Sequence, residues 1–136
     1  MPRNRATDIV VSNGRVLLIR ERRSSRYSLP GGGIERADRR SALRAAIREL
    51  LEETSLRATD AKFLFRHRTP STRHNVYWID RFSGRVRLQQ RELSDYTWWD
   101  GKSSIHLSYR TRAILKRSGF LHRGLFSRIF DVILRK

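Results

Sequence analysis

A run of three glycines in front of a helix-forming segment constrains this chain more than any other feature. Residues 27–33 read YSLPGGG, which predicts a short strand that ends in a glycine loop. The spacing of apolar residues then predicts a helix over residues 38–54. Its apolar stripe consists of Leu43, Ile47, Leu50 and Thr54. Because glycines lack β-carbons, the backbone of the loop can approach a ligand or a metal closely.

The same helix carries three glutamates, Glu49, Glu52 and Glu53, at spacings that place them on one face. Three like charges this close weaken a helix unless something neutralises them. Salt bridges to Arg44 or Arg48 are one remedy, and a solvated acidic face is the commoner arrangement. A divalent cation is the sharper remedy, because Mg²⁺ binds carboxylate oxygens and keeps positions for substrate phosphates. The neighbouring glycine loop makes the metal site the more specific interpretation.

Other patterns predict further strands and one more helix. Apolar runs on both sides of Asn13-Gly14 predict a β-hairpin between Thr7 and Arg22, since both turn residues tolerate a positive φ. Alternating or β-branched segments predict strands over residues 61–68, 74–84, 85–90 and 95–100. The segment 107–119 predicts a helix that is closed by Gly119.

The composition indicates a basic globular domain. A chain of 136 residues is long enough for one domain with its own core, and without cysteines or an apolar leader we expect a cytoplasmic protein. The net charge of +17 favours an anionic partner. However, 26 of the 30 basic residues are arginines scattered along the chain, a bias that base composition alone can produce. Nucleic acid stays open as a partner without being the primary one, and no apolar stretch is long enough for stable membrane insertion.

The last segment, residues 120–136, predicts a basic amphipathic helix. Its apolar face consists of Phe126, Ile129, Phe130 and Ile133. Such a face most often packs on its own domain or on a dimer partner, so the protein is expected to be a monomer or a homodimer. Contact with an anionic membrane surface is the alternative.

At the glycine loop and the glutamates the sequence resembles the Nudix (MutT-like) hydrolase family. The family's box runs Gly, five residues, Glu, seven residues, then Arg-Glu-aliphatic-any-Glu-Glu-any-Gly-aliphatic. RELLEETSL at residues 48–56 is similar to the end of the box, and GGGIERAD at residues 31–38 is similar to its start. Three departures are Asp38 in place of glutamate, a two-residue insertion around Arg39 and Arg40, and Ser55 in place of glycine.

The resemblance implies an α/β fold in which a mixed β-sheet is sandwiched between helices, an α/β/α sandwich. It implies a Nudix hydrolase domain over residues 1–119 and a divalent cation, Mg²⁺ or Mn²⁺, as cofactor. The implied activity is hydrolysis of a nucleoside diphosphate linked to another group, with water attacking one phosphorus. The compact chain is similar to members that convert (deoxy)nucleoside triphosphates to monophosphate and pyrophosphate. A Nudix-like domain that binds a nucleotide or RNA without turnover is the alternative.

The resemblance also assigns roles to the residues of the helix. Glu52 and Glu53 are implied metal ligands, and Glu49 is implied as a third ligand or as the base that takes a proton from water. Arg48 is expected to hold Glu49 in position by hydrogen bonding. Asp38 is expected to cap the helix, since aspartate accepts from the first free amides.

Two further ligands and a set of substrate contacts follow from the same resemblance. The carbonyl of Gly31 is an implied ligand, and Glu92 is implied as ligand or base, with a solvated loop glutamate as the equal alternative. Arg20 and Arg22 are candidates for phosphate binding. Tyr77 and Trp98 are candidates for stacking on the substrate base, although core packing is the commoner fate of such rings. The four histidines show no metal-ligand spacing and are expected to be surface or structural residues.

Overall fold

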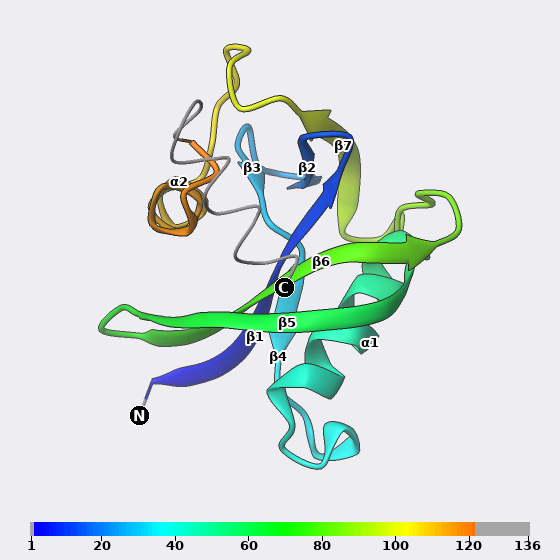
Figure 1. Cartoon of the computed structure of the whole chain (residues 1–136), viewed down its shortest axis with the longest axis vertical. Coiled ribbons are helices and arrows are strands. Elements are labelled where there is room, and N and C mark those ends of the chain that lie inside the picture. Colours follow the sequence, from blue (N-terminus) through cyan, green and yellow to red (C-terminus); the bar gives the residue numbers. More distant parts are fainter. Residues whose placement is uncertain (1, 122–136) are drawn as a thin grey trace.

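A computed structural model describes residues 2–121 of the chain (Figure 1). The strands are β1 (Arg3–Ser12), β2 (Arg15–Glu21), β3 (Tyr27–Ser28), β4 (Gly31–Gly33), β5 (Arg57–Arg68), β6 (Thr72–Ser83) and β7 (Leu93–Trp99). The helices are the 3-10 helix η1 (Arg36–Asp38), α1 (Ala42–Thr54) and α2 (Tyr109–Ser118). The predicted tail helix falls almost entirely on residues 122–136, which lie outside the described part of the chain.

Strand β1 lies at the centre of a mixed sheet. It pairs in parallel with β6 from Arg3 to Val10, and its other edge pairs with β4 in antiparallel fashion. The end of β1 turns into β2, which in turn pairs with β3 and β7, while β5 forms the outer strand beyond β6. Since β2 to β5 and helix α1 lie between β1 and β6 in the sequence, this parallel pairing brings together segments that are far apart in the chain.

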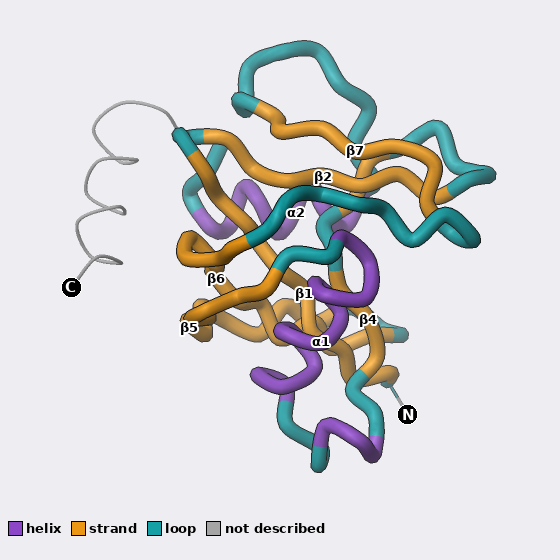
Figure 2. The backbone as a smooth tube through the Cα atoms, turned by 90° about the vertical axis from the view of Figure 1, so that its right-hand side faces the viewer, coloured by secondary structure: helices purple, strands orange, loops and turns teal. Residues whose placement is uncertain are grey.

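The two helices cover opposite faces of the sheet. Leu50 of α1 packs in a cluster with Val10 and Ile79, whereas α2 packs in a cluster with Ile9 and Trp78. Because neighbouring positions of a strand point to opposite faces, the alternation in β1 separates the two cores. Figures 1 and 2 show the strands passing between α1 and α2, with α1 in front of the sheet in Figure 2. The predicted α/β/α sandwich is therefore confirmed.

Two of the predicted turn and helix signals are confirmed in detail. Asn13 and Gly14 connect β1 and β2 with φ values of 52° and 73°, as a tight hairpin turn requires. Helix α2 ends at Gly119, whose φ of 86° is the left-handed conformation of a helix C-cap. Ser55 takes the same position after α1 with a φ of 65°, so serine adopts the conformation that the family's usual glycine favours.

Two sequence predictions are wrong. Residues 85–90 do not form a strand, because the amides of Arg87 and Gln89 donate to the carbonyls of Thr54 and Glu53 at the end of α1. The predicted apolar stripe of α1 is confirmed at Leu50 and Thr54, which are fully buried, and is wrong at Leu43. Leu43 is 41% exposed, and the helix instead buries Ala45 and Ala46 beside Leu50. Small alanines allow α1 to approach the sheet closely where a leucine would hold it away.

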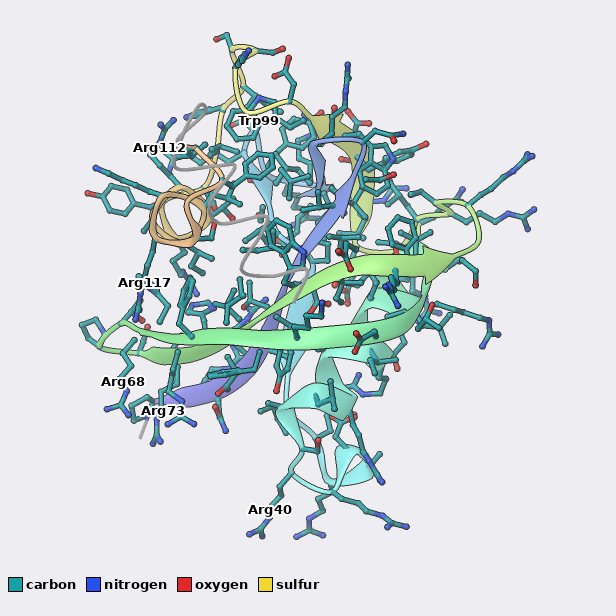
Figure 3. The ribbon with its side chains drawn as sticks, viewed as in Figure 1. Arg40, Arg68, Arg73, Trp99, Arg112 and Arg117 are labelled. Carbon is teal, nitrogen blue, oxygen red and sulfur yellow. The ribbon has the colours of Figure 1, made fainter. Side chains whose placement is uncertain are left out.

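The basic residues do not collect on one element. Figure 3 shows Arg40 projecting from the loop before α1, Arg68 and Arg73 at the free end of the β5–β6 hairpin, and Arg112 and Arg117 on α2. This spread agrees with the scattered distribution of arginines in the sequence. Within residues 2–121, no helix is long and apolar enough to cross a membrane.

Candidate active site

Arg48 forms the centre of a polar network on α1. Its Nε and Nη2 atoms donate to the two carboxylate oxygens of Asp38 at 2.8 and 2.9 Å, and Nη2 also donates to the carbonyl of Gly33. Its Nη1 atom donates to Glu49 at 2.9 Å and to Glu52 at 3.1 Å. All five N–H donors of the guanidinium group therefore have an acceptor. The predicted role of Arg48, holding Glu49 by a hydrogen bond, matches this geometry.

Asp38 lies opposite Arg48 and does not cap α1, which corrects the sequence prediction. The capping residue is Ser41, whose hydroxyl accepts from the amide of Arg44. Asp38 is only 3% exposed, and its hydrogen bonds with Arg48 hold the pKa of its carboxyl group below the usual value. The inserted residues Arg39 and Arg40 both have a positive φ, and this left-handed turn brings the carboxylate back over the helix.

Glu49 is held between Arg48 and the glycine strand. A β-carbon on Gly32 would overlap the Glu49 carboxyl group, so the absence of a side chain there makes room for the carboxylate. Burial raises the pKa of Glu49, and the negative charge of Glu52 adds to this effect, while the hydrogen bond from Arg48 opposes it. The strand β4 thus shapes the space into which Glu49 points.

Glu53, the last of the three glutamates on α1, contacts the glycine strand and has a strongly raised pKa. Its Oε1 atom accepts from the amide of Gly31 at 2.8 Å. Burial raises the pKa of Glu53 to about 8, and the charge of Glu49 contributes in the same direction. Asp8 of β1 is fully buried nearby, and neither of its carboxylate oxygens has a hydrogen-bond partner in the described part of the chain. Burial, followed by the charges of Glu53 and Glu49, raises the pKa of Asp8 well above its usual value.

This set of carboxylates fits a divalent cation. Among residues 2–121, no three acidic or histidine side chains converge closely enough to hold a metal ion as they stand, because Arg48 and the Gly31 amide hold several of the oxygens. Burial, together with the charge of a neighbouring glutamate, raises the pKa of both Glu49 and Glu53, so a nearby cation would favour their ionised forms. Carboxylate oxygens that crowd one another in this way are the ligands that Mg²⁺ prefers. Glu52 lies on the same face of α1, and 58% of its side chain is exposed.

A cavity of about 280 Å³ opens beside Glu53 and Gly31 and continues toward α2. Arg5 and Thr7 of β1 and His74 of β6 form part of its wall, and Ser108 and Arg110 at the start of α2 form another part. The sequence did not predict these residues as site residues. Arg5 and Thr7 share a face by strand alternation, but their position opposite α2 depends on pairings distant in the sequence.

The predicted substrate-binding arginines both have partners within the protein. Arg20 lies 3.9 Å from Asp95 and stacks over the ring of Tyr27. Arg22 donates to the carbonyl of Gln90. Neither arginine lines the cavity, and their role in phosphate binding stays a prediction.

The predicted aromatic contacts take different positions. Tyr77 is only 7% exposed and packs with Ala45 and Ala46 beneath α1, which is the core packing given as the commoner alternative, and its stacking on a substrate base stays a prediction. Trp98 stacks on Phe82 in the core on the α1 side. Trp99 lies in the other core, because neighbouring positions of a strand point to opposite faces of the sheet. Neither ring lines the cavity.

Glu92 is exposed on the loop before β7. Its negative charge is close enough to contribute, after larger effects, to the raised pKa of Glu53. Its carbonyl accepts from the amide of Arg22, and its own amide donates to Gln89. The side chain is therefore near the glutamate face, and its role as ligand or base remains a prediction, as does that of the Gly31 carbonyl.

Comparisons with known proteins agree with this site. The NUDIX domain model matches residues 2–109, which include the glycine strand and all of α1. The chain belongs to the Nudix hydrolase family. Its structure is similar to that of a protein assigned to the Nudix hydrolase family from Chromobacterium violaceum, with 32% identity, a TM-score of 0.75, and coverage of 98% of this chain and 89% of the other.

Two further structures illustrate the range of the family. A MutT NUDIX hydrolase from Burkholderia pseudomallei is 26% identical, with a TM-score of 0.74 over 85% of this chain and 97% of its own. An ADP-ribose pyrophosphatase from Streptococcus suis is 18% identical, with a TM-score of 0.69 over 89% and 90%, and shows the shared fold alone. No curated protein sequence gives a significant match. Nudix hydrolases act on nucleoside diphosphate derivatives and generally use divalent metal ions.

The space around Glu49 predicts different effects of two neighbouring substitutions. Gly32→Ala places a methyl group against the Glu49 carboxylate, and we expect it to lower kcat/KM by roughly 100-fold, because small displacements of catalytic groups have effects of this size. A β-carbon on Gly33 meets only the end of Arg3, at 3.9 Å. Gly33→Ala is therefore the matched control and is expected to stay within about twofold of the unmodified protein. Equal losses in the two variants would contradict the account.

The buried carboxylate of Glu53 predicts a specific dependence of stability on pH. Its folded-state pKa of about 8 lies above the value of 4.5 for a free glutamate, so the folded form binds the proton more tightly. The free energy of unfolding therefore falls as pH rises through this interval. In chelator, Glu53→Gln is expected to lack this fall and to exceed the unmodified protein by on the order of 2 kcal/mol at pH 8.

Denaturant unfolding at pH 5 and pH 8 measures this difference. Asp8 and Glu49 remain in both proteins, so the difference reports Glu53 together with its charge interactions with these two carboxylates. Parallel pH profiles would show that Glu53 carries no such cost in the folded state.

Proposed function

We propose that this chain is a divalent-metal-dependent pyrophosphohydrolase that cleaves a nucleoside diphosphate linked to another group. The observation that carries the proposal is the set of three glutamates on one face of α1, of which Glu49 and Glu52 accept from Arg48 and Glu53 lines a cavity. (Deoxy)nucleoside triphosphates, with monophosphate and pyrophosphate as products, are one candidate substrate class.

In this proposal the carboxylates of α1 hold Mg²⁺ or Mn²⁺. Glu52 and Glu53 serve as ligands, with the Gly31 carbonyl and Glu92 as further candidates. Such a cation, when bound, neutralises charge on the phosphate oxygens and makes water a stronger nucleophile. Because Glu53 has a pKa of about 8, it must lose a proton to serve as a ligand at neutral pH. Metal affinity is therefore expected to increase with pH up to about this value.

Glu49 acts on the attacking water or as a third ligand. Its carboxylate is half-buried, and one oxygen accepts from Arg48, which fixes the orientation of the group. Burial raises its pKa, and a carboxylate whose pKa lies nearer to neutrality is a better base than an ordinary exposed glutamate. Arg48 is a positioning residue, because its five donors are all occupied by protein acceptors.

The substrate extends from the glutamates into the cavity toward α2. Arg5 and Arg110 replace the predicted Arg20 and Arg22 as the cationic groups that line this space. Arg20 and Arg22 remain candidates for phosphate binding. Within the protein, Arg20 pairs with Asp95 and Arg22 donates to the carbonyl of Gln90. Trp98 packs in the core away from this cavity, and its stacking on the substrate base stays a prediction.

The test is a hydrolysis assay with Mg²⁺ or Mn²⁺ on a panel of nucleoside triphosphates, dinucleotides, ADP-ribose and nucleotide sugars, with products separated by chromatography. We expect cleavage of one substrate class and a loss of at least about 100-fold in Glu53→Gln. Asp60→Asn, which removes an exposed carboxylate on β5, is the matched control and is expected to retain activity.

Thermal unfolding of both variants confirms that they are folded. Nucleotide binding without any product, in either metal, would contradict the proposal and would favour a binding domain without turnover.

A further inference from the structure

The wall of the cavity away from the glutamates has an unusual combination of groups. Arg5 and Thr7 of β1 point to the face where His74 lies, and Arg5 and His74 are register partners across the parallel β1–β6 pair. The Oγ1 atom of Thr7 lies 2.9 Å from Nδ1 of His74, which fixes the imidazole ring. Arg110 and Ser108 approach from the start of α2. Residues from β1, from β6 and from the start of α2 thus meet in one wall of the cavity.

His74 presents an unpartnered polar atom to this space. The residue is only 3% exposed, and its Nε2 atom has no hydrogen-bond partner among the described residues. A buried polar atom without a partner carries a free-energy cost that a bound ligand can remove. Because Nδ1 is occupied by Thr7, Nε2 is the ring nitrogen that has no partner among the described residues.

The electrostatics of the wall are positive. Burial, followed by the charges of Arg5 and Arg110, lowers the pKa of His74 to about 4, and all three residues line the same cavity. Arg5 is partly buried, its Nε atom has no partner, and it forms no ion pair with a carboxylate within residues 2–121. The positive end of α2 adds a partial charge of the same sign.

The other groups that line the cavity favour binding of an anionic group of the ligand over binding of an aromatic ring. No Phe, Tyr or Trp of the described chain lines the cavity, so it offers no aromatic face on which a base would stack. The carboxylates of the lining are Glu53, which faces the proposed metal, and Glu21, which is exposed at the end of β2. Solvent weakens the charge of Glu21, whereas Arg5 is partly shielded from water.

We propose that Arg5, Arg110 and His74 form a subsite for a phosphate group that is separate from the scissile diphosphate. The preferred substrate then carries a phosphomonoester on one of the groups that the diphosphate joins. Arg5 and Arg110 pair with the phosphate oxygens, and the Nε2 side of His74 contributes a neutral hydrogen bond. This inference rests on the proposed function only in placing the scissile diphosphate at the glutamates.

The first test measures binding without turnover. Calorimetry in chelator compares adenosine 2′,5′-bisphosphate with adenosine 5′-monophosphate at constant ionic strength, so that the two probes differ in one phosphate. We expect the bisphosphate to bind at least about tenfold more tightly, the range for a charge-assisted hydrogen bond. Its binding is also expected to shift the NMR signals of the His74 imidazole, whereas a non-specific anion effect would leave them in place.

Matched variants on α2 identify the source of the preference. Arg110→Gln is expected to reduce the preference to within about threefold, and Arg112→Gln, which removes the same charge from an exposed residue outside the lining, is expected to retain it. Equal affinities for the two probes, or equal losses in both variants, would overturn the proposal. Because Arg110 is exposed, its substitution does not disturb the core.

Hydrolysis of a matched pair, NADP⁺ and NAD⁺ with Mg²⁺, separates this inference from the proposed function. A higher kcat/KM for the 2′-phosphorylated dinucleotide, lost in Arg110→Gln, supports the subsite. Cleavage of both at equal rates would overturn the subsite and leave the hydrolase function intact. Selective binding of the bisphosphate without cleavage of any panel substrate would support the subsite and contradict the hydrolase function.

Discussion

The guanidinium group of Arg48 joins the loop before α1, the glycine strand β4 and helix α1. Through Asp38 it ties the loop before α1 to the helix, and through the carbonyl of Gly33 it ties the glycine strand to the same place. Through Nη1 it fixes Glu49 and Glu52. A planar group with five donors is suited to this task in a way that lysine is not. The positions of the acidic side chains follow from this one group, and the functional proposal depends on those positions.

The site is arranged at an electrostatic cost. Glu49, Glu53 and the unpartnered Asp8 crowd one region of the interior, and burial raises the pKa of each. In the described part of the chain, the hydrogen bonds from Arg48 and the Gly31 amide and the charge of Arg5 oppose this effect. Proteins retain such local conflicts mainly where function requires them. The cation that we propose would offset this conflict and would account for the concentration of acids here in a chain with a net charge of +17.

Local signals predicted the parts of the fold that depend on few residues. Helix periodicity placed Glu49, Glu52 and Glu53 on one face, and Asn13-Gly14 defined the hairpin. The opposition of Asp38 and Arg48 was missed because it depends on the left-handed turn at Arg39 and Arg40, a conformation that arginine rarely adopts. The cavity wall was missed because Arg5 and His74 meet only through a parallel pairing distant in sequence. Residues 85–90 alternate like a strand but find their acceptors at the end of α1.

The central claim is that the pair of Arg48 and Asp38 orders the glutamates, and a double-mutant cycle tests it most directly. Arg48→Lys, Asp38→Asn and the double variant are compared in the free energy of unfolding and in kcat/KM with saturating Mg²⁺. The account predicts a coupling energy of about 1.5–3 kcal/mol in stability, the range for contacting residues of one charged network. It also predicts that each single variant loses most of the activity that the double variant loses. Effects that add to within about 0.5 kcal/mol, as for distant sites, would contradict it.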